Sequence, residues 1–140
     1  GLENAQFFRF GVMHRNTFLD SPRLLDGCFR LKKRTGLYFA GQLTGVEGYI
    51  ESAASGIAAG RNLARELSGR EPRPLPEDTM LGALSRYISD LTVTDFQPMG
   101  CNMGILPPLE KQERNKELRY TKMAQRAVAS LHRYLEEEKR

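Results

Sequence analysis

Seven residues between positions 41 and 52 have the types and the spacing to bind a polar or anionic cofactor. Glycines leave the backbone open to a ligand, and the amide and hydroxyl side chains among the seven add hydrogen-bonding groups. A glycine turn placed before a helix presents unpaired backbone N–H groups and the positive end of the helix dipole to a ligand. We therefore expect cofactor binding, and no catalytic side chain, at these positions: Gly41, Gln42, Thr44, Gly45, Gly48, Tyr49 and Ser52.

The elements that would position these residues are a strand before the turn and a helix after it. Residues 37–40 form a short apolar run between two glycines, which is typical of a buried strand in a parallel sheet. Small and apolar residues then recur at helical spacing from about Gly48 to Ser68, and Gly69 occupies the expected left-handed cap. The pattern predicts an α/β fold with a site at the carboxyl edge of the sheet. The same pattern also occurs in α/β proteins that bind no cofactor.

The segment Thr35-Gly-Leu-Tyr-Phe-Ala-Gly-Gln42 resembles the second flavin fingerprint of flavoproteins with two dinucleotide-binding domains. Most of those proteins carry Asp in place of Gln42, although an amide can still bond the ribityl hydroxyls. The Ala-Gly-Gln ending is usual in flavin-dependent tRNA-modifying enzymes. Within that group, Gly45-Val-Glu-Gly-Tyr-Ile-Glu-Ser52 resembles the TrmFO family of folate- and FAD-dependent tRNA uracil-5-methyltransferases. The sister GidA-type wobble-uridine modifiers usually have Thr-Thr in place of Val46-Glu47.

Other segments also resemble the closing part of the TrmFO family, so the resemblance covers essentially the whole chain. These segments are Met13-His-Arg-Asn-Thr-Phe18, Asp20-Ser-Pro22, Leu81-Gly-Ala-Leu84, Phe96-Gln-Pro-Met99 and Gly104-Ile-Leu-Pro-Pro-Leu109.

The resemblance implies the carboxyl-terminal part of a Rossmann-like FAD-binding domain, with few strands, the glycine loop and its helix, followed by additional helices. It implies FAD as cofactor, methylenetetrahydrofolate and NAD(P)H as co-substrates, and C5 of a T-loop uracil in tRNA as the methylated position. The family's catalytic cysteines would lie upstream of Gly1. Because the chain begins at Gly1 and lacks a Gly-x-Gly-x-x-Gly loop, we expect an amino-terminal half of the same polypeptide as its partner.

A polar group precedes the predicted site in the sequence. His14, Arg15 and Asn16 follow two apolar stretches that favour extended structure. A histidine beside an arginine could bind a phosphate or a folate carboxylate, although charged residues at a strand end are often only solvated. The resemblance implies that these three residues lie near the flavin and contact substrate or phosphate.

The resemblance and the composition together imply three parts of the chain. Residues 1–69 would belong to the FAD-binding domain, and residues 70–77 contain three prolines, which indicate a stiff connector. Residues 78–140 would form a helical region that packs on the FAD domain, with one helix from about Thr79 to Ser89 and another from about Leu109 to Glu138. Between these helices, Asn102 and Met103 are candidates for contact with a cofactor or a neighbouring domain.

Composition indicates a globular protein. The formal net charge is +4 with a pI near 9.3, which permits contact with a polyanion without requiring it. No apolar run approaches the ~18 residues of a membrane span, and Cys28 and Cys101 are too far apart to indicate a metal site or a disulfide framework. We therefore expect a cytoplasmic protein without metal or membrane contact. The start at Gly1 and the missing Gly-x-Gly-x-x-Gly loop keep one alternative open, a non-catalytic module that binds RNA or a partner protein through its basic helix and loop.

Overall fold

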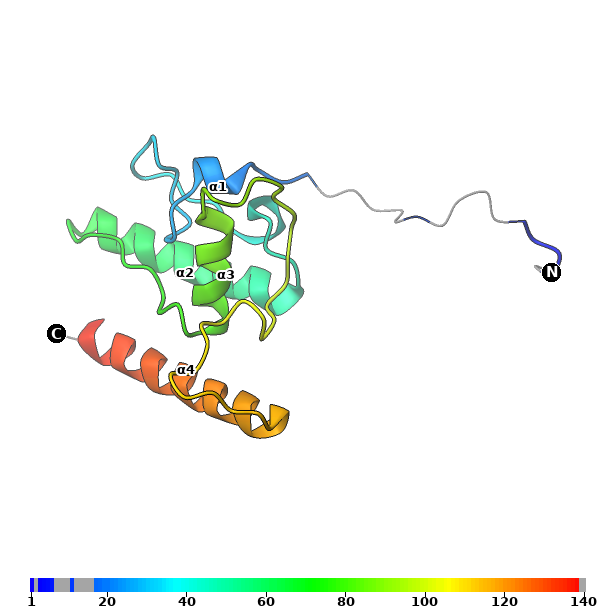
Figure 1. Cartoon of the computed structure of the whole chain (residues 1–140). Coiled ribbons are helices and arrows are strands. Elements are labelled where there is room, and N and C mark those ends of the chain that lie inside the picture. The colour runs from blue at the N-terminus through cyan, green and yellow to red at the C-terminus, as the bar shows by residue number, and fades with distance from the viewer. Residues whose placement is uncertain (2, 7–10, 12–16, 139–140) are drawn as a thin grey trace.

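The computed structural model describes residues 1, 3–6, 11 and 17–138, and the regular secondary structure of this part of the chain is helical (Figure 1). The helices are α1 (Ser21–Leu24), the 3-10 helix η1 (Gly41–Thr44), α2 (Tyr49–Leu67), α3 (Met80–Ser89) and α4 (Lys116–Glu138). The predicted contact residues His14, Arg15 and Asn16 lie outside the described residues.

Helix α2 begins and ends where the sequence predicts. Gly48 precedes it with a φ of 102°, a conformation that favours glycine. At the other end Ser68 is the cap residue, and Gly69 follows with a φ of 73°. The predicted helix is therefore confirmed at both ends.

The two later helices differ in how well their starts could be predicted. Thr79 caps α3 as expected, because its hydroxyl accepts a hydrogen bond of 3.1 Å from the backbone N–H of Gly82. Helix α4 begins at Lys116, later than the predicted Leu109. Asn115 sets this start, since its side-chain oxygen accepts a 3.0 Å hydrogen bond from the N–H of Leu118.

The predicted parallel strand over residues 37–40 is wrong for the described chain. These residues are half-buried, and they meet one neighbouring segment through an isolated antiparallel bridge between Tyr38 and Arg30. Two backbone hydrogen bonds flank this bridge, from the Leu31 N–H to the Leu37 carbonyl and from the Phe39 N–H to the Phe29 carbonyl. A buried parallel strand needs paired segments on both sides, and the described residues offer a partner on one side. Among them only isolated bridges occur, so the expected α/β class is not confirmed.

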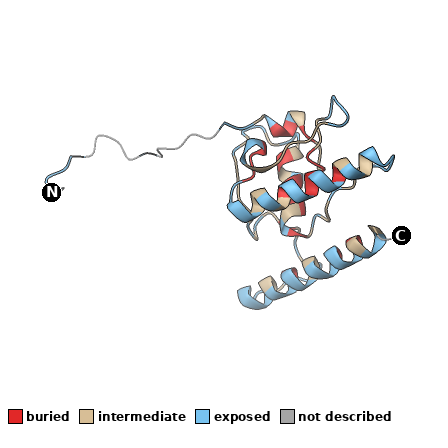
Figure 2. Cartoon of the chain, turned by 180° about the vertical axis from the view of Figure 1, so that it is seen from behind, coloured by how far each residue is buried: buried red, intermediate tan, exposed pale blue. Residues whose placement is uncertain are grey.

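The core lies where α2 and α3 cross (Figure 1). Leu84 and Ile88 of α3 are fully buried, and they pack in one cluster with Phe29, Val46 and the small residues Ala58 and Ala59 of α2. The opposite side of α2 is exposed along much of its length, as the pale blue helix in Figure 2 shows. The core therefore uses one face of α2.

The proline-containing segment after α2 forms neither helix nor strand as far as Pro76. Hydrogen bonds hold this segment to α2 and to α4. The N–H of Arg73 donates to the side chain of Asn62 at 2.7 Å, and the Tyr134 hydroxyl of α4 donates to the Arg73 carbonyl at 3.1 Å. The Arg73 guanidinium lies 4.4 Å from the Tyr134 ring centre. The segment thus joins α4 to α2.

Candidate functional site

An open hollow of about 490 Å³ lies at the amino-terminal end of α2. Its lining consists of Gln42, Glu47, Gly48, Tyr49 and Ser52. Four of these residues belong to the seven predicted from the sequence. Tyr49 is 97% exposed and Gln42 is also exposed, so both side chains are available to a ligand.

The first turn of α2 contributes backbone N–H groups to this hollow. Gly48 has no side chain with which to cap the helix, and no other described side chain caps it. An uncapped helix of this length presents partial positive charge at its start. Ser52 adds a hydroxyl, for which no hydrogen bond to another described residue is found.

Three of the predicted residues do not belong to the lining of the hollow. Gly41 donates its N–H to the Ser55 hydroxyl at 2.8 Å. Thr44 is completely buried, and its hydroxyl donates to the Gly41 carbonyl at 2.8 Å. These bonds fix the η1 turn, and the Thr44 hydroxyl is already used within the chain.

Gly45 does not face open space. A Cβ built on this residue would lie 2.4 Å from the Phe96 ring, which fills the position. The backbone of this turn is also paired, since Met99 donates its N–H to the Gly45 carbonyl at 2.9 Å and Glu47 donates to the Met99 carbonyl at 3.0 Å. Gly45 therefore allows close packing of the loop that carries Phe96, and it does not line the hollow.

Two carboxylates make the hollow partly acidic. Glu47 lines it, and the Glu51 carboxylate lies so close to Gly48 that a Cβ there would meet it at 2.1 Å. Glu51 also belongs to the first turn of α2, where negative charge interacts favourably with the helix dipole. Its charge and, to a larger extent, burial raise the pKa of the nearby Cys101 thiol.

The geometry fits a ligand that presents hydroxyl or carbonyl groups to α2. Helix N–H groups and the Gln42 amide can donate to such oxygens, and the Gln42 carbonyl and the two carboxylates can accept from hydroxyls. A free phosphate would lie beside two negative charges and is disfavoured. The ribityl and ring-carbonyl parts of a flavin nucleotide have the matching chemistry.

The sequence contained a signal for Phe96 and Met99 but not for their role. Both belong to the segment Phe96-Gln-Pro-Met99, which stands out through its resemblance to the TrmFO family. Their contact with the glycine turn joins segments far apart in the chain, and no local periodicity reports such a contact.

Neither cysteine has the surroundings of a nucleophile. Burial, with a smaller effect of Asp26, raises the pKa of the Cys28 thiol to about 12, so this thiol stays protonated at neutral pH. In the described part of the chain, no group of three or more His, Cys, Asp or Glu residues could hold a metal ion. None of the described helices combines the length and apolar character that crossing a membrane requires.

Comparisons with known proteins identify relatives over nearly the whole chain. The family model described as glucose inhibited division protein A, GIDA, matches residues 1–71. Two curated relatives carry the name methylenetetrahydrofolate--tRNA-(uracil-5-)-methyltransferase TrmFO. The Ligilactobacillus salivarius protein is 52% identical over 96% of this chain, and the Lactiplantibacillus plantarum protein is 53% identical over 98% of it. The chain spans 31% of the length of each of these relatives.

A solved structure of Aquifex aeolicus GidA is 36% identical, with a TM-score of 0.46, over 49% of this chain and 11% of that protein. The Thermotoga maritima TrmFO is 51% identical over 97% of the chain, and again the chain spans 31% of its length. The chain therefore belongs to the family described as glucose inhibited division protein A, and within that family to its TrmFO branch.

Proposed function

We propose that this chain is the carboxyl-terminal part of a flavoprotein that methylates C5 of a T-loop uracil in tRNA. The carbon donor would be methylenetetrahydrofolate, and FAD, recharged by NAD(P)H, would supply the reducing electrons. The names of relatives about three times as long as this chain support the proposal. The remaining sequence would include the catalytic residues.

The observation that carries this proposal is the hollow at the uncapped start of α2. In the proposed holoprotein, the Gln42 amide and the Ser52 hydroxyl bind the ribityl chain. The N–H groups of the first turn of α2 face the ring carbonyls, where the helix dipole stabilises negative charge. Tyr49 covers the opening with its exposed ring. These residues bind and orient the cofactor, while the redox chemistry belongs to the cofactor itself.

The predicted residues that do not line the hollow have supporting roles in this proposal. Gly41, Thr44 and Gly45 hold the turn in shape through the internal contacts described above. His14, Arg15 and Asn16 would contact the substrate or a phosphate from outside the described residues.

A flavin-retention experiment tests the site in the full-length protein. Gln42→Ala removes an exposed amide without disturbing the core, so the protein should fold and lose FAD during purification, with about 1–2 kcal/mol weaker binding for a lost hydrogen bond. The absorbance ratio of flavin to protein measures retention. Gln125→Ala, at an exposed position of α4, is the matched control and should remain fully loaded. Equal loading of the two variants would contradict the assignment.

The family match favours one alternative function, GidA-type modification of a wobble uridine. Val46-Glu47 and Glu51-Ser52 stand where that family usually has Thr-Thr and Glu-Ala, which counts against it. One experiment distinguishes the two functions. The tRNA is treated with the full-length enzyme and digested, and its nucleosides are identified by mass spectrometry. We expect 5-methyluridine in the T-loop, and a modified wobble uridine would establish the alternative.

A further inference from the structure

A second hollow, far from α2, lies between the start of α4 and the loop that precedes it. This groove has a volume of about 780 Å³. Its floor is apolar, because Leu106 and Met123 are buried there and Met103 and Leu109 pack against them. Tyr120 packs on the same cluster and is half-buried, so part of its ring faces the groove.

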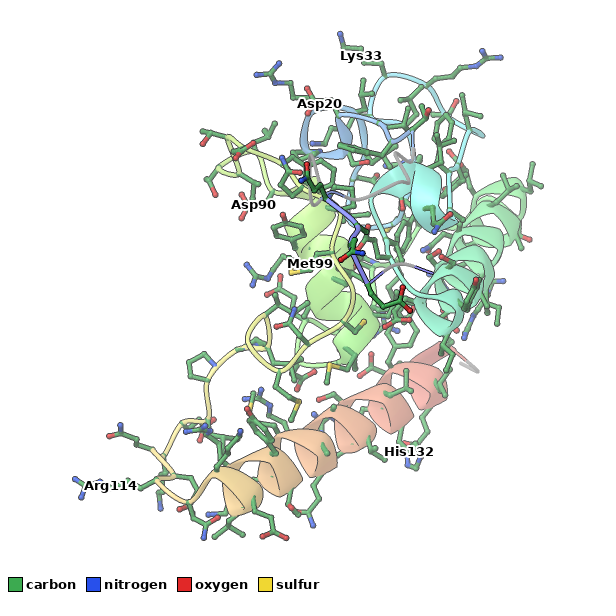
Figure 3. All side chains as sticks on the ribbon, turned by 90° about the vertical axis from the view of Figure 1, so that its right-hand side faces the viewer. Asp20, Lys33, Asp90, Met99, Arg114 and His132 are labelled. Atoms are coloured by element: carbon green, nitrogen blue, oxygen red, sulfur yellow. The ribbon has the colours of Figure 1, made fainter. Side chains whose placement is uncertain are left out.

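Cationic side chains surround this tyrosine. The guanidinium carbon of Arg119 lies 5.4 Å from the centre of the Tyr120 ring, and the Lys116 ammonium lies 5.7 Å from it. Arg114 lines the groove from the loop, and Figure 3 shows its side chain extending away from the body of the molecule. Among the described residues, no carboxylate forms an ion pair with any of these three cations.

Other basic residues of α4 are used within the chain. Lys122 pairs with Glu113 at 2.7 Å, which lowers the pKa of that carboxyl group. The Arg126 guanidinium donates to the carbonyls of Pro107 and Pro108 at 2.6 and 2.8 Å. These contacts hold the loop against α4, and they neutralise one of the two acidic residues in the groove lining. The remaining positive charge gathers around Tyr120.

We propose that this groove binds an unpaired nucleotide of an RNA substrate. The exposed part of the Tyr120 ring stacks on the base, with Met103 and Leu109 beside it, and Arg114, Arg119 and Lys116 contact the flanking phosphates. This proposal rests on the proposed function for the presence of RNA, but it uses a different surface from the flavin site.

The combination of groups in the groove favours single-stranded RNA over other ligands. A planar aromatic ring offers a stacking surface to any base, and arginine side chains combine phosphate contacts with stacking. A duplex shields its bases in the stack, whereas loops and ends can present one. A purely apolar partner would leave the three cations without counter-charges.

The test measures the affinity of the full-length protein for an unmodified tRNA transcript at about 0.15 M salt. Tyr120→Leu keeps apolar volume over Leu106 and Met123 but removes the flat ring, so the Kd should rise by about 5-fold to 100-fold. Tyr120→Phe retains the ring and should bind like the wild type. Arg114→Gln with Arg119→Gln should also weaken binding and should flatten the slope of log affinity against log salt by about 1.4.

The matched control is Lys33→Gln with Arg34→Gln, which removes the same charge from an exposed loop. Figure 3 shows Lys33 and Arg114 at opposite ends of the molecule. The control should leave the Kd within about twofold, because only non-specific attraction changes. Equal weakening in the two double variants, or an unchanged Kd in Tyr120→Leu, would overturn the proposal.

A crosslink identifies what occupies the groove. A photoreactive phenylalanine in place of Tyr120 should attach to tRNA, and the same group in place of Tyr87 should not. A crosslink from position 120 only to the protein's own chain would overturn the proposal in favour of intramolecular packing. Flavin content is measured in every sample, so loss of the flavin site and failure of the groove are observed separately.

Discussion

At the scale of single residues, Gly45 shows how closely the site depends on packing. Its φ of 85° is unfavourable for other residues, and the Phe96 ring leaves no room for a Cβ. Gly45→Ala in the full-length protein should therefore lower the free energy of unfolding by about 2–4 kcal/mol, through backbone strain together with overpacking. Urea denaturation followed by circular dichroism measures this loss.

Gly36→Ala separates the two causes. Gly36 also has a positive φ, 72°, but an added Cβ would meet nothing within 4 Å. Gly36→Ala should lower the free energy of unfolding by only about 1 kcal/mol, because the backbone is strained but the added Cβ clashes with no other atom. If the two variants lose the same stability, the Phe96 contact is not responsible for the requirement at Gly45.

At the scale of elements, the N-cap of α3 allows a direct test. Thr79 is buried, accepts from the Gly82 N–H and donates to the Pro76 carbonyl at 2.7 Å. Thr79→Ala should destabilise the full-length protein by about 1 kcal/mol or somewhat more, since both hydrogen bonds are lost. Thr79→Ser keeps the hydroxyl and should recover most of this loss. Thermal unfolding would compare the variants, and equal melting temperatures for Ala and Ser would contradict the capping role.

Helices with local start and stop signals could be predicted from the sequence, and contacts between distant segments could not. Gly48 and Gly69 mark the ends of α2 through backbone conformations that favour glycine, and Thr79 caps α3 with its own side chain. For α4 the apolar periodicity indicates a helix but not its first residue, which depends on the cap at Asn115. The apolar run 37–40 resembles a strand, yet pairing depends on segments elsewhere in the chain.

The candidate site shows the same difference between local patterns, which could be predicted, and contacts of distant segments, which could not. Gln42, Gly48, Tyr49 and Ser52 follow one another closely, so a local pattern found them, and they line the hollow together. The pattern could not reveal that Phe96 fills the space beside Gly45. The position of the Phe96 ring depends on the path that the chain takes after α3.

At the scale of the whole molecule, α2 has an apolar face that nothing in the described chain covers. Its members recur three and four residues apart: Ile50, Ala53, Ile57, Gly60, Ala64 and Leu67, all exposed. Helices with such a stripe normally bury it. Added Cβ atoms at Gly56 and Gly60 would meet no described neighbour, so these glycines leave room beside α2 for the rest of the proposed longer polypeptide.

This face yields a prediction that compares two lengths of the protein. Ile50→Ser with Ile57→Ser should reduce the binding of an apolar dye to residues 1–140 alone, because both side chains are largely exposed there. In the full-length protein the same two substitutions should lower the free energy of unfolding by about 1.5–3 kcal/mol for each isoleucine that is buried there. Denaturant titration measures the loss.

Leu91→Ser is the control for this comparison. Leu91 is 68% exposed and lies in the loop after α3, away from the stripe. It should change the stability of the full-length protein by less than about 0.5 kcal/mol. If the isoleucine substitutions lower the stability of the full-length protein no more than Leu91→Ser does, the apolar face of α2 remains exposed to water there.

The pairing between Val46 and Met99 has a consequence for the order in which the protein folds. The two backbone hydrogen bonds around it close a loop that contains all of α2 and α3. During synthesis, the glycine turn cannot reach its final shape until Met99 has left the ribosome, and the loss of chain entropy on closing so long a loop delays it further. The hollow at the amino-terminal end of α2 is therefore among the last features of this chain to form, after the helices that support it.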